Sequence, residues 1–366
     1  MNLKDKFFGC LKDGRTDCIP NMEMGIWPET IDRWHKEGLP YWVENQFHLF
    51  DHLGLDKSFN RDWLPINNEL YPHAVETVTE EGDGWKIYEN DAGLRFKRSN
   101  TMASIPQYLR FPVETREDYE RLRSRLNPDD PGRYSEDYDL EIMGRKQRGE
   151  VIGANYYGLF GFLRNLMGFE NLAVAYYDNP ELVRLMIRDH VDFGKRVFKR
   201  ALARRDIDYV QIWEDMAYKH ATIISPAFIR KYMLDGYREV VQVLRDGGVK
   251  IIYVDSDGHV EELLPILLEA GIDGVVPCEI AAGSDPVLLK EQHPGAVLMG
   301  GVDKRVLAAD GREGARRELN RLRPVMRKGK YIPFIDHIIP PDISYDTFLY
   351  YIDLKDKLLA DLGAKI

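Results

Sequence analysis

Residues 250–259 read KIIYVDSDGH, in which a short apolar run leads directly into two aspartates, a glycine and a histidine. Such a run, rich in β-branched residues, predicts a buried strand at 250–254. The same succession of a short strand and a helix-length segment recurs from about Val151 onward, which predicts βαβ units and a parallel sheet. The predicted strands are 151–156, 209–213, 250–254, 274–277, 296–299 and 331–335, and the predicted helices between them are 180–204, 226–246, 260–269 and 314–327.

The residues at the ends of these strands indicate whether the sheet is open or closed into a barrel. Nearly every strand finishes in polar or reactive side chains, namely Asn155 and Tyr156, Glu214 and Asp215, Asp255 and Asp257, Cys278 and Glu279, Asp303, and Asp336 and His337. In a (β/α)8 barrel the C-terminal strand ends meet at one mouth, whereas an open sheet spreads them along a crevice. Aspartates also stand there simply as helix caps. We therefore predict an α/β fold in which residues 1–366 form a single (β/α)8 TIM-type barrel domain.

The first part of the chain, residues 1–150, is irregular and rich in aromatic and charged residues. Residues 75–97 alternate and are punctuated by Gly-Asp-Gly and Asn-Asp-Ala-Gly, which predicts an antiparallel meander. Thr115, followed by Arg-Glu-Asp, predicts the start of a short helix. The barrel is thus expected to carry an elaborated N-terminal region ahead of the regular βα units of residues 151–366.

Composition limits the classes of function. The formal net charge of the 366 residues is −10, which argues against a nucleic-acid partner because such a protein needs a basic face. No apolar run approaches the roughly 18 residues that a membrane helix needs. Cys10, Cys18 and Cys278 include no close pair and form no disulfide framework. Together these features predict a cytoplasmic protein without a nucleic-acid or membrane partner.

Two pairs of carboxylates are candidates for the chemistry. Glu214 and Asp215 follow the apolar run 209–213, so the pair would stand at the barrel mouth and suit proton transfer or cation binding. Alternatively, Asp215 caps the next helix and Glu214 alone faces inward. Asp255 and Asp257 are two residues apart at a strand end and offer two ligands to a metal on one face. Asp257 could instead form an Asx turn before Gly258.

A histidine completes the candidate catalytic set. His337 follows the apolar strand 331–335 and precedes Pro340-Pro341, whose stiff backbone would hold the imidazole in place. The chain contains no Gly-x-Gly-x-x-Gly, Walker, Gly-x-Ser-x-Gly or His-Glu-x-x-His motif. The sequence therefore gives no support for the commonest kinds of dinucleotide-binding, nucleotide-binding, serine-hydrolase or zincin function.

Other strand ends are candidates for cofactor binding. Gly300 lies in a Gly-Gly turn that would let the backbone approach a ligand closely. We predict that Gly300, Asp303 and the strand-end Asn155 contribute to a cofactor site. Lys304 and Arg305 would either bind an anionic group or form the solvated start of a helix.

Several segments carry a family resemblance: GLFGFLRNLMGFE at 158–170, QIWED at 211–215, DSDG at 255–258, MGGVDK at 299–304, and Asp336-His337 ahead of Pro-Pro-Asp. By these segments the chain resembles the uroporphyrinogen decarboxylase superfamily from about residue 150 to the C-terminus, and more weakly before it. The superfamily comprises the haem-pathway decarboxylase and related cobalamin-dependent methyltransferases. The resemblance implies a (β/α)8 barrel.

Within that superfamily the methyltransferase branch matches better. The decarboxylase grips propionates through an N-terminal arginine-rich motif, and residues 20–28, PNMEMGIWP, contain no arginine. Methyltransferases that act on thiols hold zinc through a His-x-Cys pair and a later Cys, and the resemblance places Asp255, Asp257 and His337 at those positions. Carboxylate and imidazole ligands make a harder site than thiolates, better suited to polarising an oxygen.

The predicted function is a corrinoid-dependent methyltransferase that moves a methyl group between a small, O-methylated substrate and a corrinoid protein. Zinc would be held by Asp255, Asp257 and His337, and the candidate catalytic residues are Glu214, Asp257 and His337. The expected partners are the small molecule, the corrinoid protein and a second copy of the chain.

Two alternatives stay open. In the first, a decarboxylase-like lyase without a metal uses Glu214, Asp257 and His337 for acid–base work on a small carboxylated or aromatic compound. In the second, the chain is a binding protein that has lost catalysis. Tryptophans of the N-terminal part would line an apolar substrate pocket or simply belong to the core: Trp27, Trp34, Trp42, Trp63 and Trp85.

Overall fold

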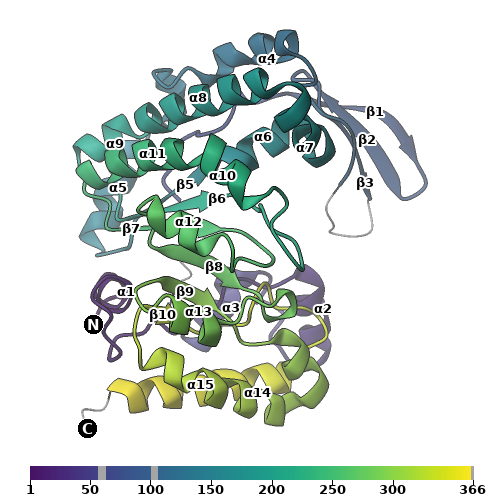
Figure 1. The fold of residues 1–366 in the computed structure, drawn as a ribbon. Helices are drawn as coiled ribbons and strands as arrows, with labels where there is room; N and C mark the ends of the chain where they lie inside the picture. The colour runs from purple at the N-terminus through teal and green to yellow at the C-terminus, as the bar shows by residue number, and fades with distance from the viewer. Residues whose placement is uncertain (57–62, 100–105, 364–366) are drawn as a thin grey trace.

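A parallel sheet forms the centre of the molecule. The computed structural model describes residues 1–56, 63–99 and 106–363. The strands of this sheet are β5 (Gly153–Tyr157), β6 (Tyr209–Trp213), β7 (Ile251–Asp255), β8 (Gly274–Cys278), β9 (Val297–Gly300) and β10 (Tyr331–Ile332). Each pairs in parallel with the next along the chain, in the order β10-β9-β8-β7-β6-β5 (Figure 1). The six predicted strands and their parallel pairing are confirmed, although the last strand spans only Tyr331–Ile332 of the predicted 331–335.

The pairing continues beyond both edges of this sheet. A barrel joins consecutive strands throughout, whereas a doubly wound sheet reverses its order at a switch point. Isolated parallel bridges join Trp63 to β5 at one edge and Ile26 to the segment after β10 at the other. The backbone N–H of Asp56 donates to the carbonyl of Asn21 at 2.8 Å, which links these two outer segments. Closure into eight strands goes beyond the six that the described residues form, so it is taken up below as a proposal.

Helices cover the sheet, with boundaries that differ from the sequence prediction. The segment 180–204 forms α8 (Pro180–Val197) and α9 (Lys199–Ala203), and 226–246 forms α10 (Pro226–Tyr232) and α11 (Leu234–Asp246). Helix α12 (Leu264–Glu269) begins later than predicted. Helix α14 (Lys304–Met326) begins earlier, where the side chain of Asp303 caps it by accepting the N–H of Arg305. It is kinked at Gly311, whose φ is +55°, so the predicted helix 314–327 corresponds to the part after the kink. The other helices are α1 (Leu3–Leu11), α2 (Pro28–Lys36), α3 (Gln46–Leu53), α4 (Arg116–Arg123), α5 (Tyr138–Gln147), α6 (Leu159–Met167), α7 (Phe169–Asp178), α13 (Pro286–Gln292) and α15 (Tyr345–Gly363).

The predicted meander is a second, antiparallel sheet that projects from the side of the molecule near α6 and α7 (Figure 1). Its strands β1 (Glu76–Gly82), β2 (Trp85–Asn90), β3 (Arg95–Ser99) and β4 (Gln107–Arg110) pair in chain order. The helix predicted after Thr115 is α4. Thr115 and Asp118 form a capping box, in which each side chain accepts the backbone N–H of the other.

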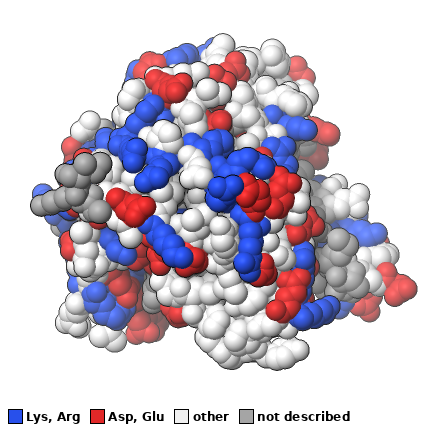
Figure 2. Space-filling model, turned by 90° about the horizontal axis from the view of Figure 1, so that it is seen from below, with Lys and Arg blue, Asp and Glu red and all other residues white. Residues whose placement is uncertain are grey.

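Helices α14 and α15 pack side by side at the β10 end of the parallel sheet (Figure 1). Figure 2 shows that basic and acidic side chains intermingle on the face of the molecule seen from below. Arg312 pairs with Asp346 across the two helices, and Arg316 pairs with Glu313 within α14. Within the described residues, no helix is both long and apolar enough to cross a membrane.

A buried ion pair joins α15 to residues 22–23 and to the segment that follows β10. Lys355 and Glu23 are fully buried and in contact, and Lys355 also donates to the carbonyl of Met22 at 3.0 Å. Glu23 accepts the hydroxyl of Tyr351 at 2.9 Å and the backbone N–H of Ile335 at 3.0 Å. Because Ile335 leads directly into Asp336-His337, this network fixes the start of a loop that carries a candidate site residue.

Candidate functional site

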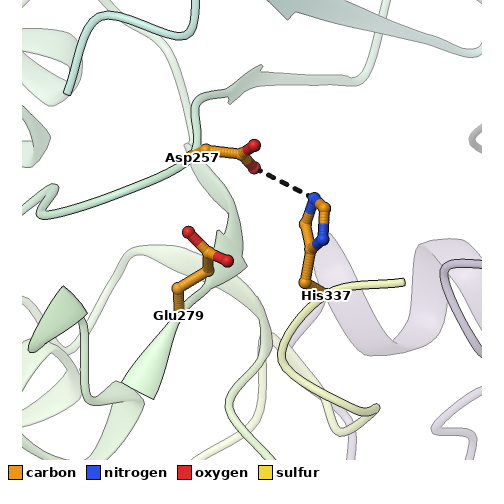
Figure 3. Close-up of side chains that lie close together, drawn as sticks. All are labelled: Asp257, Glu279 and His337. Carbon is orange, nitrogen blue, oxygen red and sulfur yellow. Dashed lines mark ion pairs between the residues drawn. The ribbon is translucent and has the colours of Figure 1, made fainter. Parts of the chain in front are cut away.

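Three side chains meet at the C-terminal ends of neighbouring strands. Asp257 follows β7, Glu279 directly follows β8, and His337 lies in the loop after β10 (Figure 3). Each is partly exposed and offers one ligand atom, and the three atoms lie within 4.8 Å of one another. Nε2 of His337 is 3.3 Å from Oδ1 of Asp257. Residues separated by 80 positions in the chain are therefore brought together, as the sequence predicted for Asp257 and His337.

Tight local geometry sets the position of Asp257. Gly258, the next residue, has a φ of +92°, and a Cβ there would lie 2.8 Å from the backbone of Ala217, so the turn requires glycine. The N–H of Gly258 donates to Oε2 of Glu279 at 2.9 Å. The N–H of Asp257 points to Oδ1 of Asp215 at 3.4 Å. The turn after β7 is thus tied to the residues that follow β6 and β8.

Asp336, the neighbour of His337, joins two of the loops. Its side chain is fully buried and accepts the backbone N–H of Ile280 at 3.0 Å and that of Lys304 at 3.3 Å. Ile280 follows Glu279, so a single carboxylate connects the loop of Glu279 to the loop of His337. Burial raises the pKa of Asp336, against the lowering effect of Lys304.

The charges in the cluster act on one another. Burial is the largest influence on the pKa of His337 and lowers it, but the hydrogen bond and charge of Asp257, with Glu279, raise that pKa above its usual value. Burial likewise raises the pKa of Asp257, and His337, Lys304 and Arg164 together hold it below its usual value. Nζ of Lys304 lies 3.4 Å from Oε1 of Glu279. The cluster is therefore a balanced set of two carboxylates, an imidazole and an ammonium group.

A cavity of about 440 Å³ adjoins the cluster. Asp257 and Glu279 line it on one side, and Tyr218, Lys219 and Arg305 line it elsewhere. Its size suits a small organic molecule, since ligand pockets of proteins measure roughly 300–1,000 Å³. The cluster therefore stands beside a space that a substrate could occupy.

The chain shares its fold with a solved enzyme. A methyltransferase from Methanosarcina mazei matches it with a TM-score of 0.61 at 12% sequence identity, over 98% of this chain and 99% of that one. This chain has the fold of that methyltransferase. A B12-independent methionine synthase from Shewanella sp. W3-18-1, in complex with selenomethionine, gives a TM-score of 0.41 at 16% identity, over 61% of this chain and 67% of that one. No protein-family model and no curated protein sequence matches the chain.

The predicted metal ligands divide between two overlapping groups. Among the described residues, Asp257 belongs with Glu279 and His337, and it also belongs with Asp215 and Asp255. The predicted trio of Asp255, Asp257 and His337 is therefore not one compact group. Asp255 and Asp257 approach each other as predicted, together with Asp215, but His337 belongs to the other group. A metal-binding role for these residues stays a prediction.

Asp255 and Asp215 are held by neighbouring side chains. Oδ2 of Asp255 accepts a hydrogen bond from Nε2 of Gln211 at 2.6 Å, and Oε1 of Gln211 accepts the hydroxyl of Tyr253 at 3.2 Å. Arg164 donates to the carbonyl and the carboxylate of Asp215 at 2.9 and 3.3 Å. Burial and the charge of Asp257 raise the pKa of Asp215.

Glu214, a predicted catalytic residue, caps the N-terminus of α6, a helix that lies far from it in the sequence. Its carboxylate is fully buried and accepts the backbone N–H groups of Leu159, Phe160 and Gly161 at 2.7, 2.9 and 2.8 Å. These are the first N–H groups of α6, which have no partner within the helix. Burial raises the pKa of Glu214 to about 7, against the lowering by these donors and by Tyr237. We assign Glu214 a structural role, because its donors occupy both oxygens.

The predicted cofactor-binding residues also have partners within the protein. The Gly300 turn has a φ of +101°, and a Cβ there would lie 3.0 Å from the backbone N of Cys278, so the close approach is to β8. Asp303 caps α14 and pairs with Arg305 at 2.7 Å. The backbone carbonyl of Asn155 accepts a hydrogen bond from the side chain of Asn68. The side-chain Oδ1 of Asn155 is buried and has no hydrogen-bond partner among the described residues. A cofactor-binding role for Gly300, Asp303 and Asn155 stays a prediction.

Two members of the cluster were not in the predicted set. Glu279 was recognised as a polar strand end, yet the family pattern favoured Asp255 in its place. Lys304 was considered as a ligand for an anionic group, and its partners are Glu279 and Asp336, the latter at 3.6 Å. The strand-end rule alone would have placed Glu279 beside Asp257, because β7 and β8 are parallel neighbours in the sheet.

Proposed function

We propose that this chain catalyses methyl transfer on a small molecule bound in the cavity beside Asp257, Glu279 and His337. The observation that carries the proposal is the convergence of these three side chains, within 4.8 Å, beside a cavity of about 440 Å³. The fold shared with a methyltransferase supports it. Membership in the uroporphyrinogen decarboxylase superfamily and closure of the barrel belong to the same proposal. The strand order and the bridges of Trp63 and Ile26 support closure.

We further propose that the cluster holds a metal ion, with zinc as the first choice. One imidazole and two carboxylates make a three-ligand set that leaves a coordination position free for a substrate. Asp257, Glu279 and His337 would hold the ion, since their ligand atoms lie within 4.8 Å of one another. Asp255 is not in this set, because it groups with Asp215 and Asp257 and not with Glu279 and His337.

The residues have separate tasks in this proposal. A bound metal would supply Lewis-acid stabilisation of the charge that develops on the substrate oxygen as its bond to the methyl carbon breaks. Lys304 offsets part of the negative charge of the carboxylates, and Asp336 holds the loops of Glu279 and His337 in register. We place the methyl acceptor, a corrinoid, on a separate protein that docks over the mouth. Association of two copies of the chain stays a prediction.

Metal content tests the cluster directly. Protein purified without chelators should retain about one equivalent of zinc, and Asp257→Asn and His337→Gln should each retain at least tenfold less. The matched control is Asp346→Asn, an exposed carboxylate on α15 that pairs with Arg312. It should retain zinc like the wild type. Wild-type protein that holds less than about one-tenth equivalent after zinc is supplied removes the metal from the proposal.

Turnover tests the reaction. The chain, a corrinoid protein supplied in its reduced Co(I) form and a panel of small methoxylated compounds should give methylated corrinoid and the demethylated product in equal amounts. The Co(I) centre of the partner would supply the electron pair of the new bond to the methyl carbon. The electron pair of the broken carbon–oxygen bond stays on the product oxygen, which takes a proton from water, so the product appears as an alcohol or phenol. Absence of turnover over the whole panel, with zinc bound, would favour the binding protein that has lost catalysis.

Acid–base catalysis without a metal is the second candidate, and one contact favours it. Nε2 of His337 lies 3.3 Å from Asp257, whose hydrogen bond and charge help to raise the pKa of the imidazole. A histidine held in this way can donate a proton to a substrate near neutral pH. The substrate would be a small carboxylated or aromatic compound, as for a decarboxylase-like lyase. Activity that survives complete removal of zinc, and is lost in His337→Gln, would select this candidate.

A further inference from the structure

A second cavity lies between the antiparallel sheet and α6, away from the acidic cluster. Its volume is about 190 Å³, and it shares no lining residue with the cavity beside Asp257. Residues of the meander contribute one wall, with Asn90 at the end of β2 and Leu94 just before β3. Phe162 and Leu166 of α6 contribute the opposite wall. The methyl-transfer proposal does not use this cavity.

The walls fix the size and shape of a ligand. Apolar side chains dominate the lining, including those of Leu70, Leu94, Pro112, Phe162 and Leu166. A dry apolar cavity of about 150 Å³ is large enough to bind benzene. The cavity therefore has room for one six-membered ring that carries a small substituent.

The polar groups fix the charge of that ligand. Glu69 is exposed at the cavity, and its Oε1 accepts the hydroxyl of Tyr157 at 2.7 Å. Burial and the charge of Glu69 raise the pKa of Tyr157, so the phenol stays protonated and donates. Oε2 of Glu69 has no hydrogen-bond partner among the described residues. The described lining contains no lysine or arginine, and its histidine, His73, is hydrogen-bonded through Nε2 to Asn67 at 2.9 Å. Glu69 is the one carboxylate of that lining, and it makes the cavity attractive to a cation and unattractive to an anion.

The amide of Asn165 adds a second polar contact. It lines the same cavity from α6, and it has no hydrogen-bond or ion-pair partner among the described residues. An amide offers both a donor and an acceptor. Asn165 can therefore bind a hydroxyl or an amine of a ligand without favouring either charge, which leaves Glu69 as the group that discriminates.

We propose that this cavity is a second ligand site, which binds a small single-ring molecule with a cationic head group. The ring lies between Leu94 and Phe162, and an ammonium or amidinium group lies against the carboxylate of Glu69. This site is separate from the proposed methyl-transfer function, so each can fail without the other.

Three single-ring probes of similar size and different charge test the site: benzylamine, benzyl alcohol and benzoate, titrated calorimetrically into the full chain. Benzylamine should bind most tightly, benzyl alcohol more weakly, and benzoate least. Glu69→Gln keeps an acceptor for Tyr157 and removes the charge. It should weaken benzylamine binding about fivefold, the value of an exposed ion pair at its upper limit, and leave benzyl alcohol unchanged.

A side chain that fills the cavity should strongly weaken the binding of every probe. Leu94→Trp places an indole in the space and should weaken both benzylamine and benzyl alcohol at least tenfold. Ala74→Leu fills the same cavity from another wall and replaces Leu94→Trp if that variant fails to fold. Glu76→Gln, an exposed carboxylate of β1 outside the cavity, is the charge-matched control and should bind all probes like the wild type.

Several outcomes would overturn the proposal. Benzoate that binds as tightly as benzylamine would remove Glu69 as the discriminating group, and so would equal weakening of benzylamine and benzyl alcohol in Glu69→Gln. Unchanged binding in a folded cavity-filling variant would place the ligand elsewhere. Absence of binding by all three probes at millimolar concentration would remove the site.

Discussion

Replacement of Lys355 by methionine should cost a large part of the stability of this protein. The ammonium group and the carboxylate of Glu23 are both fully buried, and the substitution leaves that carboxylate with the hydroxyl of Tyr351 and the N–H of Ile335. Removing one partner of a buried ion pair costs about 3–5 kcal/mol, because the other charge stays in a poorly solvated place. Whole domains are stable by about 5–15 kcal/mol, so about a third of the total is expected to be lost.

Urea unfolding of four proteins measures this effect: wild type, Lys355→Met, Glu23→Gln and the double variant. We expect Lys355→Met to lose about 4 kcal/mol. The double variant should be more stable than Lys355→Met, since it contains no uncompensated charge, with a coupling energy of about 2–3 kcal/mol. The matched control is Lys357→Met, an exposed lysine of the same helix that pairs with Asp353, and its unfolding midpoint should not change.

Two results would refute this reasoning. The first is a Lys355→Met protein within about 1 kcal/mol of the wild type, which would mean that water reaches Glu23. The second is a double variant whose loss equals the sum of the single losses, since independent sites add. The experiment also bears on the site, because Ile335 is two residues before His337.

Three further outcomes are expected. Burial lowers the pKa of His190 to about 4, so the native state excludes a proton that the unfolded state binds below about pH 6.5. Stability should fall by about 3 kcal/mol as the pH falls from 6.5 to 4, and urea unfolding of His190→Phe should lack this component. Gly158→Ala puts a Cβ 1.9 Å from the carboxylate of Glu214 that caps α6, and it should lower the free energy of unfolding by about 1–3 kcal/mol in thermal unfolding. The control Gly144→Ala meets only a flexible arginine and should not destabilise the protein. Equal unfolding midpoints for the two variants would contradict the packing of Glu214 against Gly158. Asp257→Asn should lower the pKa of His337 in an NMR titration, and an unchanged titration would mean that the two side chains do not interact in solution.

The sequence was sufficient for the strands, because their signal is local. A run such as Ile251–Val254 is apolar, β-branched and bounded by polar residues, so it is recognisable without its neighbours. Helix boundaries were less predictable. The start of α14 depends on Asp303 acting as a cap, and the break at Phe198 between α8 and α9 leaves no mark in an amphipathic pattern.

The candidate site was predictable in part for the same reason. The C-terminal ends of parallel strands share one edge, so the meeting of Asp257 and His337 follows from topology. The direction of a side chain beyond the strand end does not follow. Glu214 and Asp215 are adjacent, yet one turns back to cap α6 and the other faces Arg164. The pairing of Glu23 with Lys355 joins residues 332 positions apart and is a property of the assembled fold.

The bonds of Asp336 to Ile280 and Lys304 have an evolutionary consequence. Families that share a parallel α/β fold usually change their substrates through the loops that follow the C-terminal ends of the strands. Here a change of length in the loop of Ile280 or in the loop of Asp336 would break the hydrogen bond between them. A new substrate specificity is therefore more easily reached through point substitutions in the cavity wall. We expect homologues that keep Asp336 to vary at positions such as 218 and 219 while the lengths of the two loops stay constant.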